Sequence, residues 1–247
     1  MISHYDLPYK DGLYLDLHLP KSDVFDLFVY FHGGGLTAGN RGGVEVFAKT
    51  LAERGIATAT VEYRLYPEAK FPDFIEDGAD AIAWLKENIH AYGSCRRMYV
   101  GGSSAGGYIS MMLCFDDRFL AKVGMKPTDI DAYIHDAGQP TSHFNVLKEQ
   151  GKDNRRIIVD ETAPLFFVGL AKTYSPMLFI VSDNDMHGRY EQTMVMIKTL
   201  EHFGHTENVC LDVRQGKHCS YVKQEENGQG VFGNAILSFL KAHGFLS

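Results

Sequence analysis

The sequence predicts an α/β fold, in which a mainly parallel central sheet is covered by helices on both faces. Short apolar runs alternate along the chain with longer segments whose apolar residues recur at helical spacing, and this alternation is typical of parallel sheets. Most of the runs are continuously apolar, as expected of strands that are buried on both faces. A glycine-rich turn at residues 101–107 joins one run to an apolar helical segment, which indicates a tight connection between a strand and a helix.

Length and composition indicate a globular protein. The 247 residues are enough to bury a sizeable core, and we expect a single domain over residues 1–247 with a cap-like insertion at about 141–172. Apolar residues make up 45% of the chain, which excludes a disordered protein. The net charge is −7 and no basic stripe is present, so we expect no nucleic-acid partner.

The first residues of the sequence and its cysteines predict the cellular compartment. Residues 1–9 contain neither a cationic nor an apolar signal region, and no apolar run is long enough to span a bilayer. The four cysteines show no C-x-x-C spacing and are too sparse for a disulfide scaffold; they are Cys95, Cys114, Cys210 and Cys219. We therefore expect reduced thiols in a cytoplasmic protein.

The first predicted strand lies near the edge of the sheet. Residues 13–19 alternate between apolar and polar side chains, which is typical of a half-buried antiparallel strand. The Lys-Asp-Gly sequence at residues 10–12 is typical of a hairpin turn. We expect the sheet to begin near Leu13.

The remaining strands and helices follow in alternation. The predicted strands are residues 26–31, 56–61, 98–100, 130–134, 177–181 and 208–213. The predicted helices are residues 44–54, 74–89, 108–115, 190–203 and 231–240. Gly55 ends the first of these helices, and Pro67 and Pro72 keep the loop before the second one non-helical. Residues 141–170 are polar and irregular, and a segment this long between strands is often a lid or a binding region.

Residues 102–106 have the G-x-S-x-G spacing of a nucleophile elbow, with Gly102, Ser104 and Gly106 at the three defined positions. In such an elbow the serine lies on a sharp, strained turn between a strand and a helix. The helix that follows points its first N–H groups at any negative charge that forms there. Ser104 is therefore the candidate nucleophile.

A serine hydroxyl attacks efficiently when a base removes its proton and a carboxylate orients that base. Asp183 and Asp185 follow the strand at 177–181, and His218 follows the strand at 208–213. The carboxyl ends of parallel strands meet at one edge of a sheet, so these side chains can converge with Ser104.

Several residues compete for the roles of base and acid. His187 lies two residues from Asp185, too near to act as a separate base, and His205 is expected to end a helix, so His218 is preferred. Periodicity does not separate Asp183 from Asp185, and either aspartate could instead cap the following helix.

The sequence His32-Gly33-Gly34-Gly35 follows a buried strand and matches the HGGG type of oxyanion loop. Glycines let the main chain approach a substrate and aim N–H groups at an oxyanion. A second donor is expected from the residue after the nucleophile, Ala105. We expect His32 to support the loop through hydrogen bonds.

With these motifs, the chain resembles the hormone-sensitive-lipase-like group of α/β-hydrolases, which includes many short-chain carboxylesterases. The resemblance rests on residues 32–35, on Tyr-Arg-Leu-Tyr-Pro-Glu at 63–68, on residues 102–107, and on Asp185 and His218. It implies the α/β-hydrolase fold and the chain order of nucleophile, acid and base that is found in this family.

The resemblance also assigns roles to residues. It implies that Ser104 is the nucleophile, Asp185 the acid and His218 the base, and it matches Gly34, Gly35 and Ala105 to the oxyanion donors. It favours Asp185 over Asp183 because the family acid stands three residues past the small residue that ends the strand, here Ser182.

The chain departs from the family pattern at three places. The family often carries a long helical N-terminal cap, whereas here the sheet is expected to begin near Leu13. Ser103 stands where an acidic residue is usual, and Tyr66 replaces a common alanine. A small cap and an open site are more similar to compact acetyl esterases and sugar-ester hydrolases than to lipases.

The resulting functional hypothesis is a serine carboxylesterase that hydrolyses acetyl to butyryl esters, with acetylated carbohydrates among the candidates. Its partner is a small-molecule ester, and the mechanism requires no metal and no organic cofactor. One alternative is an amide or formamide hydrolase, such as a kynurenine-formamidase-like enzyme or a peptidase. Another is a ligand-binding relative without activity, which ranks low because all three triad positions are filled. Self-association through an edge strand or the last helix is a further hypothesis.

Overall fold

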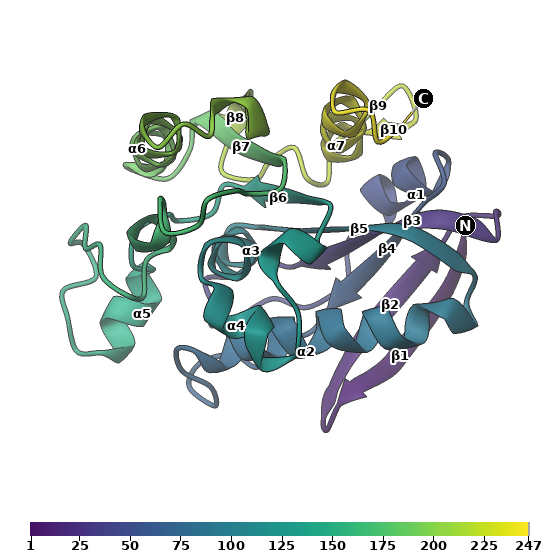
Figure 1. The fold of residues 1–247 in the computed structure, drawn as a ribbon, viewed down its shortest axis with the longest axis horizontal. Coiled ribbons are helices and arrows are strands. Elements are labelled where there is room, and N and C mark those ends of the chain that lie inside the picture. The colour runs from purple at the N-terminus through teal and green to yellow at the C-terminus, as the bar shows by residue number, and fades with distance from the viewer. Residues whose placement is uncertain (247) are drawn as a thin grey trace.

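The computed structural model describes residues 1–246, so Ser247, the last residue of the predicted domain, lies outside the described residues. One large sheet is formed by β1 (Ile2–Lys10), β2 (Leu13–Leu19), β3 (Val24–Phe31), β4 (Ile56–Val61), β5 (Ser94–Ser103), β6 (Ala132–Asp136), β7 (Met177–Asn184) and β8 (Val209–Lys217). Its order is β1-β2-β4-β3-β5-β6-β7-β8 (Figure 1). The strands from β4 to β8 in this order run parallel, whereas β1 and β2 are antiparallel to their neighbours. The predicted α/β class is confirmed.

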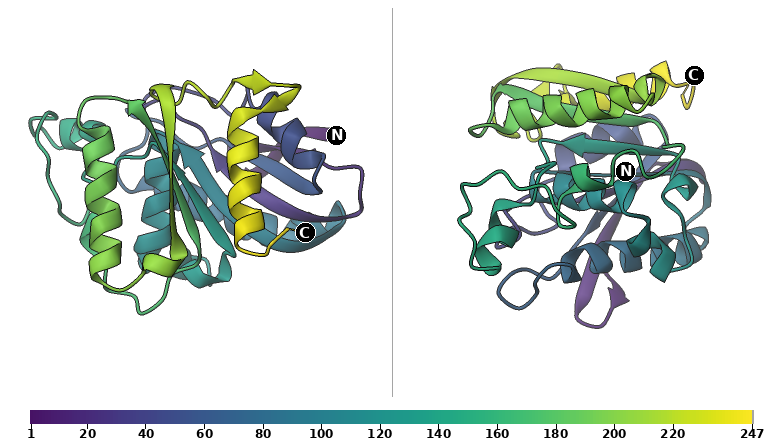
Figure 2. Two further views of the ribbon diagram at one scale, coloured as in Figure 1. Left: turned by 90° about the horizontal axis from the view of Figure 1, so that it is seen from above. Right: turned by 60° about the vertical axis from the view of Figure 1, so that its left-hand side comes forward.

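Helices cover both faces of the sheet. They are α1 (Glu45–Ala52), α2 (Asp73–Asn88), α3 (Ala105–Phe115), α4 (Asp117–Lys122), α5 (Phe144–Glu149), α6 (Arg189–His202) and α7 (Val231–Ala242). The core residues of α1 and α7 lie on one face, and those of α2, α3 and α6 lie on the other. The left-hand view of Figure 2 shows α6 in green and α7 in yellow on opposite sides of β8. Within residues 1–246, none of the helices combines the length and the apolar character needed to cross a membrane.

The position of β3 in the centre of the sheet explains why its sequence is continuously apolar. Leu27, Val29 and Phe31 pack into the core beneath α2 and α3. Phe28 and Tyr30 point to the opposite face and pack with α1 and α7. Successive side chains of a strand alternate between faces, so a strand with helices on both sides needs apolar residues at every position.

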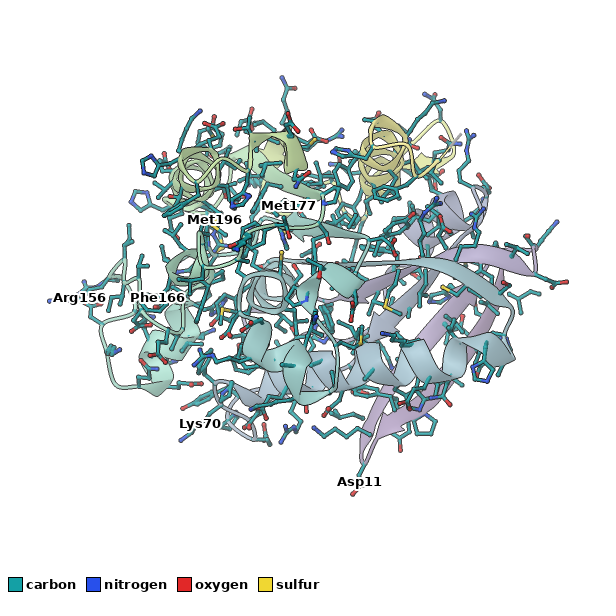
Figure 3. All side chains as sticks on the ribbon, viewed as in Figure 1. Asp11, Lys70, Arg156, Phe166, Met177 and Met196 are labelled. Atoms are coloured by element: carbon teal, nitrogen blue, oxygen red, sulfur yellow. The ribbon has the colours of Figure 1, made fainter. Side chains whose placement is uncertain are left out.

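The core on the α2, α3 and α6 side continues to the far end of the sheet. Met177 of β7 and Met196 of α6 are both fully buried and belong to this same core (Figure 3). These two residues pack α6 onto the sheet beside the start of β7.

The sheet begins at Ile2, not near Leu13 as predicted. The strand β1 pairs with β2 across the turn at residues 11–12. Tyr9 is its single buried residue, and its register is broken between His4 and Leu7, where Asp6 adopts a φ of 56°. An irregular, exposed edge strand has no alternating pattern, which is why the sequence did not reveal it.

The strands β5 and β8 are longer than predicted. In β5 the polar start is held by an ion pair, because Arg96 Nε donates to the buried carboxylate of Asp26 at 3.0 Å. In β8 the strand continues to Lys217 as an exposed edge of the sheet, so His218 follows it directly. Apolar patterning underestimates strands whose ends carry charged side chains.

The segment between β6 and β7 is more ordered than the sequence suggested. It contains α5 and a 3₁₀ helix at Pro164–Phe167, neither of which was predicted. Two contacts dock it on the helices that cover the sheet: Glu149 Oε1 accepts the N–H of Phe71, just before α2, at 2.8 Å, and the hydroxyl of Tyr108 in α3 donates to Thr162 O at 2.6 Å. Arg156 lies exposed at its outer edge (Figure 3).

The N-terminus of α3 approaches β3 too closely for any side chain between them. A Cβ atom built on Gly106 would lie 1.9 Å from the carbonyl oxygen of Phe31. Such a contact is far below van der Waals distance, so only glycine allows this approach.

We predict that Gly106→Ala destabilises the protein although alanine is the better helix former. The clash with the Phe31 carbonyl requires a backbone shift, and overpacking of this kind costs about 3 kcal/mol of unfolding free energy. Urea unfolding of the variant and the wild type measures the difference. Gly42→Ala is the matched control, because a Cβ there meets only the end of the Asn40 side chain. Equal stability of the Gly106→Ala variant and the wild type would contradict the prediction.

Candidate active site

Ser104 stands alone between β5 and α3 in a strained conformation. Its φ of 56° and ψ of −110° lie in a region that non-glycine residues seldom adopt. Its N–H donates to the carbonyl oxygen of Asp136, at the end of the neighbouring strand β6, at 2.8 Å. A Cβ on Gly102 would lie 2.6 Å from the carbonyl carbon of Gly106. Both motif glycines are therefore needed for the turn, which projects the hydroxyl beyond the end of the sheet.

The hydroxyl of Ser104 belongs to a hydrogen-bonded row of three side chains. His218 Nε2 lies 2.8 Å from Ser104 Oγ, and His218 Nδ1 lies 2.5 Å from Asp185 Oδ1. The carboxylate can only accept, so Nδ1 carries the proton and Nε2 is the acceptor for the serine hydroxyl. The three residues follow β5, β7 and β8, whose carboxyl ends lie at one edge of the sheet. In this geometry the imidazole can remove the hydroxyl proton.

Asp185 is held in its ionised form. Its side chain is fully buried and accepts hydrogen bonds from the N–H groups of Met186, at 2.7 Å, and Ser182, at 3.2 Å. Burial alone would raise the pKa of this carboxyl, but the hydrogen bonds from His218 and the two N–H groups outweigh burial and keep the pKa below its ordinary value. The anion can therefore orient His218 and stabilise it when it gains a proton.

The structure separates the competing residues. Asp183 accepts the N–H of Gly216 at 2.9 Å and so joins the ends of β7 and β8, whereas Asp185 contacts the imidazole of His218. His187 is exposed. His205 packs edge-on against Tyr174, with ring centroids 4.7 Å apart. Of the sequence candidates, only Asp185 and His218 lie in the row with Ser104.

Cys219 is the second potential nucleophile beside the imidazole. Its Sγ lies 3.7 Å from His218 Nε2, which is farther than the serine hydroxyl. Burial raises the pKa of this thiol well above its ordinary value, so it stays protonated and weakly nucleophilic. Ser104 is therefore the better placed nucleophile. In the described part of the chain, no three His, Cys, Asp or Glu side chains are grouped so that they could hold a metal ion.

His32 orients the first peptide unit of the glycine loop. Its Nδ1 donates to Gly33 O at 2.7 Å, and its ring is stacked on Tyr63 with centroids 4.4 Å apart. Burial lowers the pKa of His32 and keeps it neutral. The C=O and N–H of a trans peptide point in opposite directions, so this hydrogen bond turns the N–H of Gly34 away from His32.

A tight turn orients the second peptide unit in the same way. The carbonyl of Gly34 accepts the N–H groups of Thr37, at 3.2 Å, and Ala38, at 3.1 Å, which points the N–H of Gly35 away from that turn. The loop touches the nucleophile, because a Cβ on Gly33 would lie 3.3 Å from Ser104 Cβ.

The N–H groups beside the Ser104 hydroxyl are available for a ligand. Between residues 1 and 246, no residue accepts a hydrogen bond from the N–H of Gly34, Gly35 or Ala105. Three donors with fixed directions next to a hydroxyl are the arrangement that can stabilise a developing oxyanion.

Asp136 is a buried acid of the site that the sequence analysis did not identify. Its main-chain oxygen holds Ser104, and its Oδ1 accepts a hydrogen bond from the hydroxyl of Tyr221, three residues after His218. Burial raises the pKa of its carboxyl to about 6 and outweighs the hydroxyl groups of Ser103 and Tyr221, which act to lower the pKa. An aspartate at the end of the strand next to the nucleophile was the available signal.

We predict that Asp136→Asn changes how stability depends on pH. The native state binds the Asp136 proton up to about pH 6, whereas the unfolded state releases it near pH 4. This group therefore favours the native state below pH 4, and its contribution is lost as the pH rises through 6. Because one pKa unit corresponds to about 1.4 kcal/mol, the variant should gain about 3 kcal/mol relative to the wild type between pH 4 and pH 7. Urea unfolding at these pH values tests this, and a parallel pH dependence of both proteins would contradict it.

Comparison with known proteins places this geometry in a family. The family model described as "alpha/beta hydrolase fold" matches residues 28–203. The probable carboxylesterase 6 of Arabidopsis thaliana is 36% identical over 166 residues, which are 62% of this chain and 46% of that protein. The ethyl acetate hydrolase of Pseudomonas putida is 34% identical over 120 residues, covering 45% of this chain and 38% of that protein.

A third curated relative extends the comparison. The probable isoprenylcysteine alpha-carbonyl methylesterase ICMEL1 of Oryza sativa is 34% identical over 99 residues, 39% of this chain and 23% of that protein. The matches thus span less than half of the length of these curated relatives.

The solved structure is the propionate-bound esterase Est2 of Thermogutta terrifontis. It superimposes with a TM-score of 0.78 at 18% identity, covering 99% of this chain and 96% of that one. At this identity the likeness concerns the fold. The family model covers well over half of the sequence, including the glycine loop and the Ser104 elbow, and the chain therefore belongs to the α/β hydrolase fold family.

Proposed function

We propose that this protein is a serine carboxylesterase that hydrolyses short-chain acyl esters through an acyl-enzyme intermediate. The observation that carries the proposal is the hydrogen-bonded row of Ser104, His218 and Asp185 beside a loop with unpaired N–H groups. Membership of the α/β hydrolase family and the esterase names of several relatives support it.

In the proposed reaction, Ser104 Oγ attacks the ester carbonyl while His218 Nε2 takes the hydroxyl proton. Asp185 stabilises the imidazolium, and the N–H groups of Gly34, Gly35 and Ala105 bind the tetrahedral oxyanion. His218 then returns the proton to the departing alcohol, and the acyl group stays on Ser104. Water activated by the same imidazole releases the acid.

The proposed substrates are acetyl to butyryl esters, including acetylated carbohydrates. The Pseudomonas putida relative is named for ethyl acetate, which is an acetyl ester of a small alcohol. The methylesterase relatives act, by their names, on the methyl ester of a larger carboxylic acid, so a methyl ester belongs in the test.

The segment at 141–172 and the cellular location are part of the proposal. We propose that this segment acts as a small cap, since its contacts dock it on Phe71, just before α2, and on Tyr108 of α3. A cytoplasmic location fits the cysteines, which are all unpaired among residues 1–246.

We predict serine-dependent hydrolysis of p-nitrophenyl acetate and butyrate that declines towards the octanoate and laurate. Ser104→Ala should lower kcat by about 10⁶-fold, because the nucleophile and the base act as a unit. Steady-state kinetics of both proteins on the four esters, and on an S-prenylcysteine methyl ester, measure this. Labelling of Ser104 by a fluorophosphonate provides a readout that is independent of substrate choice.

Each result of this experiment has a definite meaning. Turnover that persists in Ser104→Ala would refute the role of the serine. Labelling of Ser104 without turnover of any ester would move amide or formamide hydrolysis ahead of ester hydrolysis. Absence of both labelling and turnover would favour the hypothesis of a ligand-binding relative.

Asp183, near the end of β7, and Asp185, just after β7, should differ sharply in their effect on activity. We predict that Asp185→Asn lowers kcat by about 10⁴-fold, because an amide favours the wrong tautomer of His218. Asp183→Asn is the matched control, since its carboxylate contacts Gly216 and not the imidazole, and it should leave kcat within about threefold of the wild type. Steady-state kinetics on p-nitrophenyl acetate compare the two variants, and the reverse ranking would mean that Asp183 is the acid.

A further inference from the structure

The glycine loop next to Ser104 needs external support to keep its shape. Gly34 and Gly35 adopt φ values of 124° and 65°, and glycine has the widest conformational freedom of all residues. The directions of their N–H groups therefore depend on what holds the neighbouring carbonyls. His32 holds the carbonyl of Gly33, and the local turn holds that of Gly34.

The third carbonyl of the loop is held by a residue from far along the chain. The side-chain amide of Asn145, in the first turn of α5, donates through Nδ2 to the carbonyl oxygen of Gly35. The contact is close enough that a Cβ on Gly35 would lie 3.1 Å from Nδ2 and 3.6 Å from the ring of Phe144. This is a contact between the loop and the segment that joins β6 to β7.

We propose that Asn145 is a positioning residue for the reaction: by holding the carbonyl of Gly35, it fixes the peptide unit that follows Gly35. The peptide that carries the Gly35 N–H, directed at the oxyanion, then lies between two anchored neighbours, the other being the one that His32 holds. This inference rests on the proposed function. On this proposal, the segment between β6 and β7 helps to stabilise the transition state, in addition to any role as a cover of the site.

Asn145 can position the loop because α5 is itself held at its start. Gln139 Nε2 donates to Ser142 O at 2.9 Å and to Thr141 Oγ1 at 3.1 Å, and Gln139 Oε1 accepts the N–H of Phe144. These hydrogen bonds shape the connection from β6 into α5.

A buried cation fixes this connection to the rest of the fold. Arg189, at the start of α6, is 3% exposed and donates to the main-chain oxygen of Ala137 and, at 3.3 Å, to Gln139 Oε1. No carboxylate among residues 1–246 forms an ion pair with Arg189, so these acceptors are what its guanidinium binds. A continuous chain of contacts therefore leads from α6, four residues after Asp185, through Gln139 and α5 to the oxyanion loop.

The chemistry at position 145 requires a donor. A main-chain carbonyl only accepts hydrogen bonds, and the Asn145 amide supplies the N–H. Asn145→Asp keeps the size and shape of the side chain but places a carboxylate oxygen against the Gly35 carbonyl. The aspartate variant should therefore repel the loop, whereas Asn145→Ala only releases it.

The test compares Asn145→Ala and Asn145→Asp with the wild type in two measurements. Steady-state kinetics on p-nitrophenyl acetate should show kcat about 10- to 100-fold lower at unchanged KM, because misplaced donors weaken binding of the transition state and not of the ester. NMR order parameters of the amides at residues 34–36 should fall from values near 0.85, typical of rigid backbone, towards 0.6. The second measurement requires no turnover.

A control variant on the same helix shows what an unrelated change in α5 does. Lys148→Ala removes an exposed side chain of α5. It should keep the order parameters of residues 34–36 and stay within about threefold of the wild-type kcat.

The outcomes of these measurements decide whether Asn145 positions the glycine loop. Unchanged order parameters and kcat in both Asn145 variants would overturn the inference. An equal loss of kcat in Lys148→Ala and Asn145→Ala would also overturn it, since any change on α5 would then have the same effect. A wild type without ester turnover would contradict the proposed function, and the order parameters would still show whether Asn145 holds the loop.

Discussion

Around Ser104 the main chains of β3, β5, β6 and α3 approach one another more closely than side chains would permit. Glycines at 102 and 106 allow α3 to begin against the end of β3, and the Ser104 N–H binds the last residue of β6. Main chain packed directly on main chain cannot repack by side-chain rotation, so the strained serine is held by the whole centre of the sheet. The glycine loop and the imidazole of His218 are arranged around that fixed point.

Two buried carboxyl groups near this point have pKa values that are shifted in opposite directions, and their surroundings explain the difference. Asp185 accepts hydrogen bonds from the imidazole and two main-chain N–H groups, which favour its ionised form over the cost of burial. At Asp136 the hydroxyl groups of Ser103 and Tyr221 act to lower the pKa of the carboxyl but do not offset burial. Asp185 is thereby kept charged beside His218. Asp136 is mostly protonated below pH 6, and its main chain supports Ser104 from the neighbouring strand.

The fold class was predictable because strands buried on both faces leave a continuous apolar pattern, as in β3. The same reasoning missed β1, an irregular edge strand with one buried residue, and the charged start of β5. It also missed α5, which has only six residues: Val146 and Leu147 are fully buried, but a helix this short shows no recurring apolar spacing, and its start is held by a hydrogen bond from Phe144 to Gln139. Elements whose stability comes from polar contacts with distant residues carry little periodic signal.

The sequence by itself determined that Ser104, His218 and the HGGG loop lie at the carboxyl ends of strands, because the motifs follow apolar runs in a parallel sheet. It left Asp183 and Asp185 equivalent until the family resemblance favoured one. Only the tertiary structure decided which carboxylate reaches the imidazole, and only it brought Asn145 to a loop 110 residues earlier in the chain. The physical reason is that such contacts depend on the register of β7 and β8 and on the path between β6 and β7, which no local pattern encodes.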